Sequence, residues 1–128
     1  EIEQELALAA GQHRIALSFV PHLLPISRGI HTTVVANLAG SAEAVDSAFA
    51  RHLGAAPFAR LLGAGGYPEI RNVTRSNFLD IGWQVDTHTN RVIILAAEDN
   101  LVKGAGGQAV QSMNCMCGWD EDCGLAGC

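Results

Sequence analysis

The chain has 128 residues, of which 48% are hydrophobic and 16% charged, so it is long and apolar enough to form one domain with a real core. Its formal net charge is −5, and its 8 basic residues are scattered among 13 acidic ones, which argues against a nucleic-acid-binding surface. No apolar run approaches the roughly 18 residues of a membrane-spanning helix, so we expect a soluble, cytoplasmic protein that binds neither membranes nor nucleic acids.

The first part of the chain predicts a short helix and two strands. Residues 1–10 place apolar side chains on one helical face, and Gly11 is suited to end the helix. Because the helical pattern begins at the first residue without a capping residue, we expect that the chain was cut from a larger protein. The apolar runs 14–20 and 30–39 are rich in β-branched residues and predict two strands. Between them, the proline-stiffened loop 21–29 is the kind of segment that commonly carries binding residues.

The middle of the chain predicts a helix and then three strands. Ser41 is suited to cap a helix that ends near Leu53, and a short strand is expected at 58–62. Residues 78–86 alternate between apolar and polar, which predicts a half-buried strand with Trp83 on one face and Asp80 on the other.

A hairpin closes this middle region. Residues 87–90 have hairpin-turn chemistry, and the nearly continuous apolar run 91–97 predicts a strand in the centre of the sheet. The predicted order α-β-β-α-β-β-β-α fills a single domain, 1–128. It indicates an α+β fold whose mixed, largely antiparallel sheet has helices packed on one face.

A charged bend, a glycine cluster and a final helix follow the last strand. Glycines let the backbone approach a ligand, and a helix that begins here would present unpaired N–H groups, so we expect an anion or cofactor site at this corner. Residues 104–109 fit the pattern G-x-G-x-x-G/A, but no strand runs directly into Gly104 and no second strand follows, which excludes a Rossmann unit. Lys103 precedes the glycines, which excludes a Walker loop. The helix, at about 106–118, would carry its apolar face on Ala109, Val110, Met113 and Cys117.

All four cysteines fall in the last fourteen residues, where they cannot crosslink the body of the fold. They are Cys115, Cys117, Cys123 and Cys128. Cys115 and Cys117 are two residues apart, which on a helix points them to different faces, so we expect reduced thiols and no metal site.

Three groups of residues occur in an order and spacing that point to one family. They are Phe19-Val20-Pro21-His22-Leu23 with Ser27-Arg28-Gly29-Ile30, then Ser76-Asn77-Phe78 with Asp80-Ile81-Gly82, and then Glu98-Asp99-Asn100-Leu101-Val102-Lys103-Gly104-Ala105 with Gln108-Ala109-Val110-Gln111. With them the chain resembles the C-terminal part of N-acetyl-γ-glutamyl-phosphate reductase, a relative of the aspartate-semialdehyde and glyceraldehyde-phosphate dehydrogenases. The resemblance extends from Glu1 to about Leu125.

This resemblance implies an enzyme of which the chain would form only one domain. Such enzymes use NADPH to reduce N-acetyl-glutamyl 5-phosphate to the semialdehyde and phosphate in arginine biosynthesis, and they form homo-oligomers. Their cysteine nucleophile and histidine acid/base would lie upstream of Glu1, as would the nucleotide-binding domain. We therefore expect no catalytic residue in this substrate-binding and dimerisation domain, and no activity from it alone. Residues 104–118 would form the helix that returns to the nucleotide-binding domain.

The resemblance also implies two sets of site residues. Arg28 would hold the acyl phosphate or the carboxylate of the substrate by a forked contact, with His22, Ser27 and Gly29 beside it. The structural alternatives are a surface salt bridge for Arg28 and a packed, hydrogen-bonded side chain for His22.

The second set would bind the cofactor, NADP. Asn100 would meet the nicotinamide carboxamide, with Lys103 and Gly104 close by, whereas the alternative is an Asx turn formed by Asp99 and Asn100. Two other functions stay open at this point. One is a non-catalytic binding or dimerisation module, and the other is the related reductase of carrier-bound aminoadipyl phosphate in lysine biosynthesis.

Overall fold

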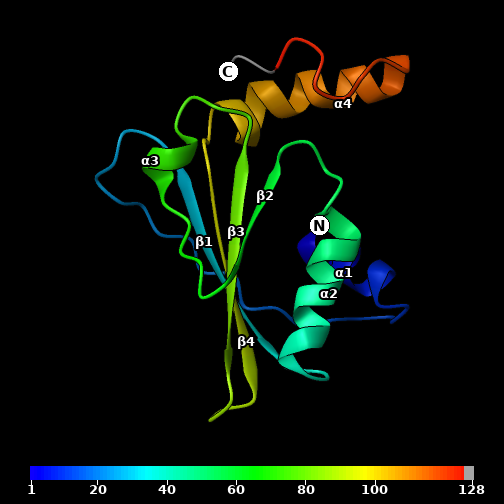
Figure 1. Ribbon diagram of the computed structural model, residues 1–128, viewed down its shortest axis with the longest axis vertical. Coiled ribbons are helices and arrows are strands. Elements are labelled where there is room, and N and C mark those ends of the chain that lie inside the picture. Colours follow the sequence, from blue (N-terminus) through cyan, green and yellow to red (C-terminus); the bar gives the residue numbers. More distant parts are fainter. Residues whose placement is uncertain (126–128) are drawn as a thin grey trace.

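The computed structural model describes residues 1–125 and shows a four-stranded sheet with helices beside it and across one end (Figure 1). The elements in chain order are α1 (Ile2–Ala9), β1 (Ile30–Asn37), α2 (Ala42–Leu53), β2 (Ala59–Ala64), α3 (Ile70–Val73), β3 (Leu79–Asp86), β4 (Arg91–Glu98), the π-helix η1 (Val102–Gly106) and α4 (Gly107–Cys117). Among the helices of these residues, none is long and apolar enough to cross a membrane.

The sheet is mixed and largely antiparallel, as the sequence predicts. Its strand order is β1-β4-β3-β2, with β4 antiparallel to both of its neighbours and β2 parallel to β3. The apolar strand β4 is therefore central, and the predicted hairpin joins it to β3 with Asp86 opposite Arg91. Because β4 pairs along its whole length on both sides, the residues that follow Glu98 are held in a fixed position at one end of the sheet.

Helix α2 packs on one face of the sheet through aromatic side chains. The hydroxyl of Ser41 accepts a hydrogen bond from the Ala44 N–H at 3.3 Å, which confirms the predicted N-cap. Phe49 stacks on Trp83 with ring centroids 4.3 Å apart, and the indole N–H of Trp83 donates to Asp46 at 2.6 Å. These contacts anchor α2, whose sequence carries only one apolar stripe, to the middle of β3.

The other face of β3 is covered as well, which corrects the prediction of a half-buried strand. Asp80 is 2% exposed and accepts a hydrogen bond from Arg60 at 2.5 Å, while Arg60 also donates to the carbonyl of Asn72 in α3. A side chain at Gly82 would overlap the backbone of Gly66. Alternation alone predicts an exposed Asp80, but a partner from the neighbouring strand lets the carboxylate be buried.

The predicted strand at 14–20 is wrong. This segment and the loop that follows have no regular structure, and their large side chains are exposed, with Phe19 at 71% and Leu23 at 104%. The Leu17 N–H donates to the carboxylate of Glu3, not to a strand. Apolar, β-branched sequence favours a strand only where a neighbouring strand pairs with it, and in the described residues β1 is the edge of the sheet.

Candidate functional site

The bend after β4 is organised by a fully buried carboxylate. Asp99 is 0% exposed, and its Oδ1 atom accepts hydrogen bonds from the backbone N–H groups of Leu101 at 2.8 Å and Val102 at 2.9 Å. The predicted Asx turn is therefore present. The amides of Gly104 and Gly106 bond back to the carbonyls of Asp99 and Leu101, which makes the π-helical turn η1. The helix start thus does not present open N–H groups to a ligand as the sequence predicts, because Asp99 caps it.

The second oxygen of Asp99 joins two segments that are distant in sequence. Its Oδ2 atom accepts a hydrogen bond from the Arg75 backbone N–H at 2.6 Å and from Nη1 of Arg28 at 3.3 Å. Burial alone would raise the pKa of Asp99, but the backbone N–H groups and the charge of Arg28 outweigh it and lower the pKa. Asp99 therefore stays ionised and holds Arg28 in place.

A second link holds the loop that carries Arg28. The Gly29 N–H donates to Oδ1 of Asn100 at 2.8 Å. Gly29 has φ 106°, and a Cβ at this position would overlap the Ile70 side chain, so only glycine fits. Because the carbonyl oxygen of Asn100 faces Gly29, its NH₂ group is left to donate elsewhere.

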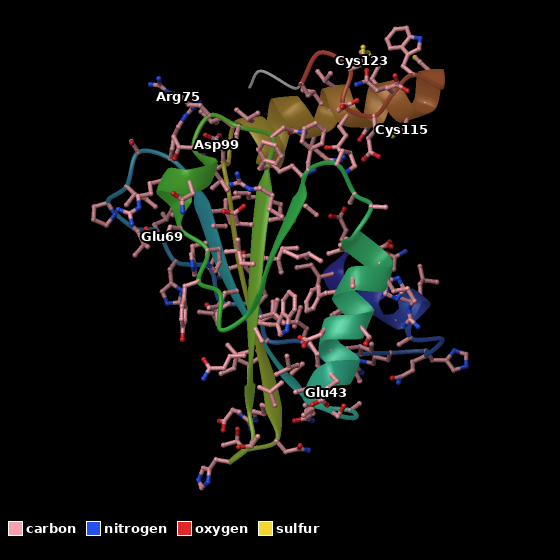
Figure 2. All side chains as sticks on the ribbon, in the orientation of Figure 1. Glu43, Glu69, Arg75, Asp99, Cys115 and Cys123 are labelled. Atoms are coloured by element: carbon pink, nitrogen blue, oxygen red, sulfur yellow. The ribbon has the colours of Figure 1, made fainter. Side chains whose placement is uncertain are left out.

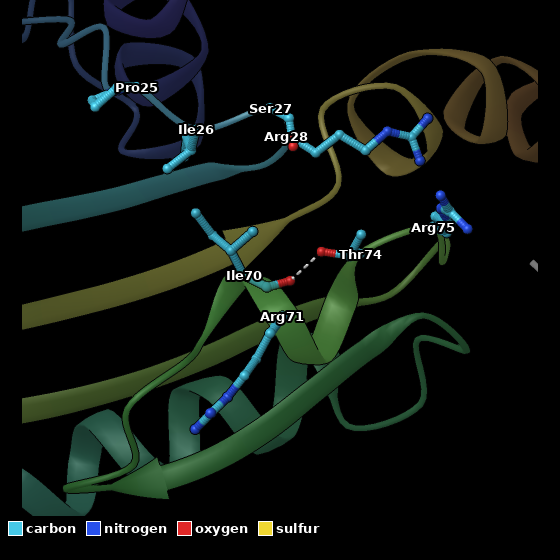
Figure 3. Close-up of a pocket in the computed structure, with 8 residues that line it drawn as sticks. All are labelled: Pro25, Ile26, Ser27, Arg28, Ile70, Arg71, Thr74 and Arg75. Carbon is cyan, nitrogen blue, oxygen red and sulfur yellow. Dashed lines mark hydrogen bonds between the residues drawn. The ribbon is translucent and has the colours of Figure 1, made fainter.

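Arg28 lies at the edge of an open pocket of about 530 Å³ between the loop before β1 and helix α3 (Figure 3). The residues that line it are Pro25, Ile26, Ser27, Arg28, Ile70, Arg71, Thr74 and Arg75. Among these described residues three are arginines and none is acidic, although the chain as a whole is negatively charged. Such a pocket is suited to bind an anionic small molecule.

The predicted substrate residues are only partly brought together. Ser27 and Arg28 line the pocket, and Gly29 lies directly behind them. His22 is exposed and does not line it. The alternative considered for Arg28, a salt bridge, is present. Its partner, however, is the buried Asp99, and this contact uses only one nitrogen of the guanidinium group.

Lys103 lies on the other side of the bend, in a network with α4. Its Nζ atom is 2.7 Å from Oε1 of both Gln108 and Gln111, and it lies 5.7 Å from the centre of the Phe58 ring. Burial lowers the pKa of Lys103, and the nearby carboxylate of Glu98 opposes this shift. A Cβ at Gly104 would lie 3.4 Å from both Oε1 of Glu98 and the Asp99 carbonyl oxygen, which is an ordinary contact distance.

Asn77 contacts the first turns of α4. Its Nδ2 atom donates to Gln111 at 3.0 Å, and a side chain at Gly107 would overlap its Oδ1 atom. Asn77 is 0% exposed, and Gly107 therefore serves close packing. The buried side of α4 carries polar residues, Gln111 and Asn114, whereas Met113 of the predicted apolar face is 46% exposed.

Two of the cysteines, Cys115 and Cys123, lie away from this pocket. Figure 2 shows Cys115 and Cys123 near the outer end of α4, whereas Arg75, Asp99 and Glu69 lie at the opposite side of the molecule. Cys115, Cys117 and Cys123 are exposed free thiols, and Cys128 lies outside the described residues. Within residues 1–125, no three His, Cys, Asp or Glu side chains gather as ligands for a metal ion.

Sequence reasoning missed Asp99 and Arg75 as members of the site. The pattern Asp-Asn-Leu-Val before a helix indicates a cap, so Asp99 could have been expected to bond Leu101 and Val102. Its contacts with Arg28 and Arg75 bridge 71 and 24 residues of sequence, and no local pattern reveals them.

Comparisons with known proteins identify the family. Residues 1–100 match the family model of the semialdehyde dehydrogenase dimerisation domain. Three curated relatives are named N-acetyl-gamma-glutamyl-phosphate reductase: those of Akkermansia muciniphila at 54% identity, Pelotomaculum thermopropionicum at 52% and Geobacter sulfurreducens at 51%. The matches cover 98–99% of this chain but 36–37% of each relative. The chain therefore belongs to the semialdehyde dehydrogenase dimerisation-domain family and is similar over nearly its whole length to part of the N-acetyl-γ-glutamyl-phosphate reductases.

Proposed function

We propose that this chain is the substrate-binding and dimerisation domain of an NADP-dependent reductase. The enzyme would convert N-acetyl-glutamyl 5-phosphate to the 5-semialdehyde and phosphate in arginine biosynthesis, in the cytoplasm. The observation that carries the proposal is the arginine-lined pocket in which Arg28 is held on the buried carboxylate of Asp99. The names of the relatives supply the reaction class.

The pocket offers what an acyl phosphate with a carboxylate needs. Arg28 is half-buried, its geometry is set by Asp99, and its remaining N–H groups can form a forked contact with a phosphate or carboxylate. Ser27 adds a hydroxyl at the same rim. Gly29 keeps the loop close to Ile70, and His22 would line the site only if the exposed part of the loop folds over the bound substrate.

The cofactor is proposed to meet the protein at the bend after β4. Asn100 fits the nicotinamide carboxamide, because Gly29 fixes its carbonyl oxygen and leaves its NH₂ group free to donate. Lys103 has two of its N–H groups on glutamine oxygens and a third left for a phosphate, and Gly104 follows it in the same turn. When bound, NADPH would supply the hydride.

The remaining groups of the reaction are proposed to come from elsewhere in the enzyme. A thiol that attacks the acyl phosphate must lie within about 3.5 Å of the carbonyl carbon, but Cys115 and Cys123 are on the far side of the molecule from Arg75. We therefore expect residues 1–128 alone to be inactive and to bind NADPH at best weakly. Calorimetry that gave micromolar affinity of this chain for NADPH would contradict this expectation.

The direct test is a steady-state assay of the enzyme that carries this chain. In the reverse direction, N-acetyl-glutamate semialdehyde, phosphate and NADP⁺ should give NADPH, followed by its absorbance. Carrier-bound aminoadipate semialdehyde serves as the competing substrate of the lysine pathway. A higher kcat/KM for the aminoadipyl substrate would overturn the assignment, and no turnover with either substrate would favour a non-catalytic dimerisation module.

A further inference from the structure

Arg75 stands out in the pocket because its backbone adopts a conformation that is unusual for an arginine. Its φ angle is 62°, in the left-handed region that favours glycine. Its N–H donates to Oδ2 of the buried Asp99 at 2.6 Å, and the next residues are also fixed, since the Ser76 hydroxyl donates to the Val73 carbonyl at 2.7 Å and Asn77 is fully buried. The surrounding contacts therefore hold Arg75 in a strained conformation that points its side chain outwards.

The guanidinium of Arg75 also differs from the other two arginines of the pocket. Arg28 is paired with Asp99, and Arg71 is paired with Glu69 at 2.5 Å. Within the part of the chain that the structure describes, the side chain of Arg75 has no hydrogen bond or ion pair. Figure 3 shows the side chains of Arg28 and Arg75 reaching the same end of the pocket, whereas Arg71 points away from it.

Two guanidinium groups that converge without an acidic group between them repel each other unless an anion binds there. Asp99 does not serve as that anion for Arg75, because it receives the backbone N–H of Arg75 and not its side chain. The same buried carboxylate thus positions both residues, one through its guanidinium and one through its main chain. This leaves two cationic side chains at the same end of the pocket for one ligand.

We infer that Arg75 is a second anion-binding residue of the pocket, and that Arg28 and Arg75 contact the two different anionic groups of one substrate molecule. This inference rests on the proposed function, whose substrate carries a phosphate at one end and a carboxylate at the other. A pair of arginines then selects for molecules with two anionic groups over those with one. Arg75 is thereby a specificity-determining residue.

The test uses two variants that remove the same guanidinium but differ in backbone preference. In the enzyme that carries this chain, Arg75→Gly relieves the left-handed strain and Arg75→Ala retains it. We expect both to lower kcat/KM for the acyl phosphate by roughly 10- to 100-fold, mainly through KM, while their melting temperatures move apart. Arg75→Lys should recover part of the loss. Arg91→Ala, which removes an exposed guanidinium at the hairpin end of β4, away from the pocket, is the control and should behave as wild type.

A binding readout makes the test independent of turnover. Calorimetric titration with inorganic phosphate and with N-acetyl-glutamate should show weaker binding of at least one of them to Arg75→Gly than to wild type. Weaker binding of phosphate would assign Arg75 to the phosphate group, whereas weaker binding of N-acetyl-glutamate alone would assign it to a carboxylate. Near-normal kcat/KM and unchanged affinity for both probes in Arg75→Gly would overturn the inference. If Arg75→Gly loses activity but Arg28→Ala does not, Arg75 binds an anion by itself, and both the two-arginine inference and the role proposed for Arg28 fail.

Discussion

The backbone N–H of Gly29 donates a hydrogen bond to the side-chain oxygen of Asn100 at 2.8 Å, across 71 residues of sequence. Gly29 belongs to the loop proposed to bind the substrate, and Asn100 to the bend proposed to bind the nicotinamide. One hydrogen bond therefore fixes the spacing between the two halves of the proposed site. Catalysis of hydride transfer requires such fixed spacing, because small displacements of the reactants are costly.

Replacing Arg28 should impair catalysis much more than stability. We expect Arg28→Ala to cost on the order of 2–4 kcal/mol in kcat/KM with NADPH affinity nearly unchanged, because the charge-assisted bonds to the substrate are lost. Arg28→Lys keeps the charge without the planar fork and should recover only part of the activity. Steady-state kinetics together with thermal melts measure both effects. If Arg28→Ala has kcat/KM within about twofold of wild type, Arg28 serves only as a partner of Asp99.

Replacing Asp99 should destabilise the fold. In Asp99→Asn the new NH₂ group faces either the Arg75 N–H and Arg28 or the Leu101 and Val102 N–H groups, so donors meet donors in a buried place. We expect a loss on the order of 2–4 kcal/mol in the free energy of unfolding, measured by urea denaturation. The exposed Asp120→Asn is the control and should unfold like wild type.

Asp99 should also make stability depend on pH in the acidic range. Its pKa is lower in the folded protein than the ordinary value of 3.8, so the folded state binds fewer protons than the unfolded state. The stabilisation is complete above the ordinary pKa and is lost as the pH falls through the lowered one. Glu98 acts in the opposite direction, because burial raises its pKa. Urea midpoints from pH 6 to pH 2 should fall less steeply for Asp99→Asn than for wild type, and parallel curves would exclude this role.

Gly29→Ala should be more harmful than a matched glycine substitution. Gly29 and Gly65 both have positive φ angles, 106° and 76°, but a Cβ at Gly65 would meet open space whereas one at Gly29 would overlap Ile70. Gly65→Ala should therefore cost about 1 kcal/mol from backbone strain, and Gly29→Ala at least about 2 kcal/mol. In an Ile70→Ala background, Gly29→Ala should lower the free energy of unfolding by less than it does in the wild type. Thermal melts of the single and double variants measure this, and equal melts for the two glycine variants would count against the overlap.

The edge strand β1 is where we expect self-association to be disturbed most easily. All eight of its residues are exposed, with Val35 at 54% and Val34 at 41%, although the strand is rich in β-branched side chains. Val35→Glu should shift the dimer towards monomer in analytical ultracentrifugation, whereas Met116→Glu, on the exposed side of α4, should not. Unchanged sedimentation of Val35→Glu would place the interface elsewhere.

Local sequence patterns correctly predicted two kinds of element. These are helices, whose hydrogen bonds lie within the segment, and strands with a long run of apolar residues. The Ser41 cap defined α2, and the apolar run of β4 indicated a central strand. The segment 14–20 failed, because strand formation depends on a neighbour that propensity does not reveal. The short α3 was also missed, because four residues give no measurable period.

In the candidate site, too, local sequence patterns predicted some features, whereas contacts between distant residues were missed. Ser27 and Arg28, which the sequence assigned to one substrate site, line one pocket, while their roles stay predictions. The hydrogen bond between Gly29 and Asn100 was not expected from the sequence. Asp99 as the common anchor could not be read from sequence. Its contact with Arg28 follows from the antiparallel pairing of β1 with β4, which brings the residue before Ile30 next to the residue after Glu98.

The π-helical turn η1 sets the rotational phase of α4. It wraps one residue more than an α-helical turn, so deleting one residue, such as Ala105, would restore ordinary winding and turn α4 by about 100° about its axis. Gln111 and Asn114 would then leave the buried side, and Lys103 would lose a partner. In this region the number of residues in the turn, more than their identity, decides which face of α4 meets the sheet. Length changes at this turn are therefore expected to be tolerated less well than substitutions.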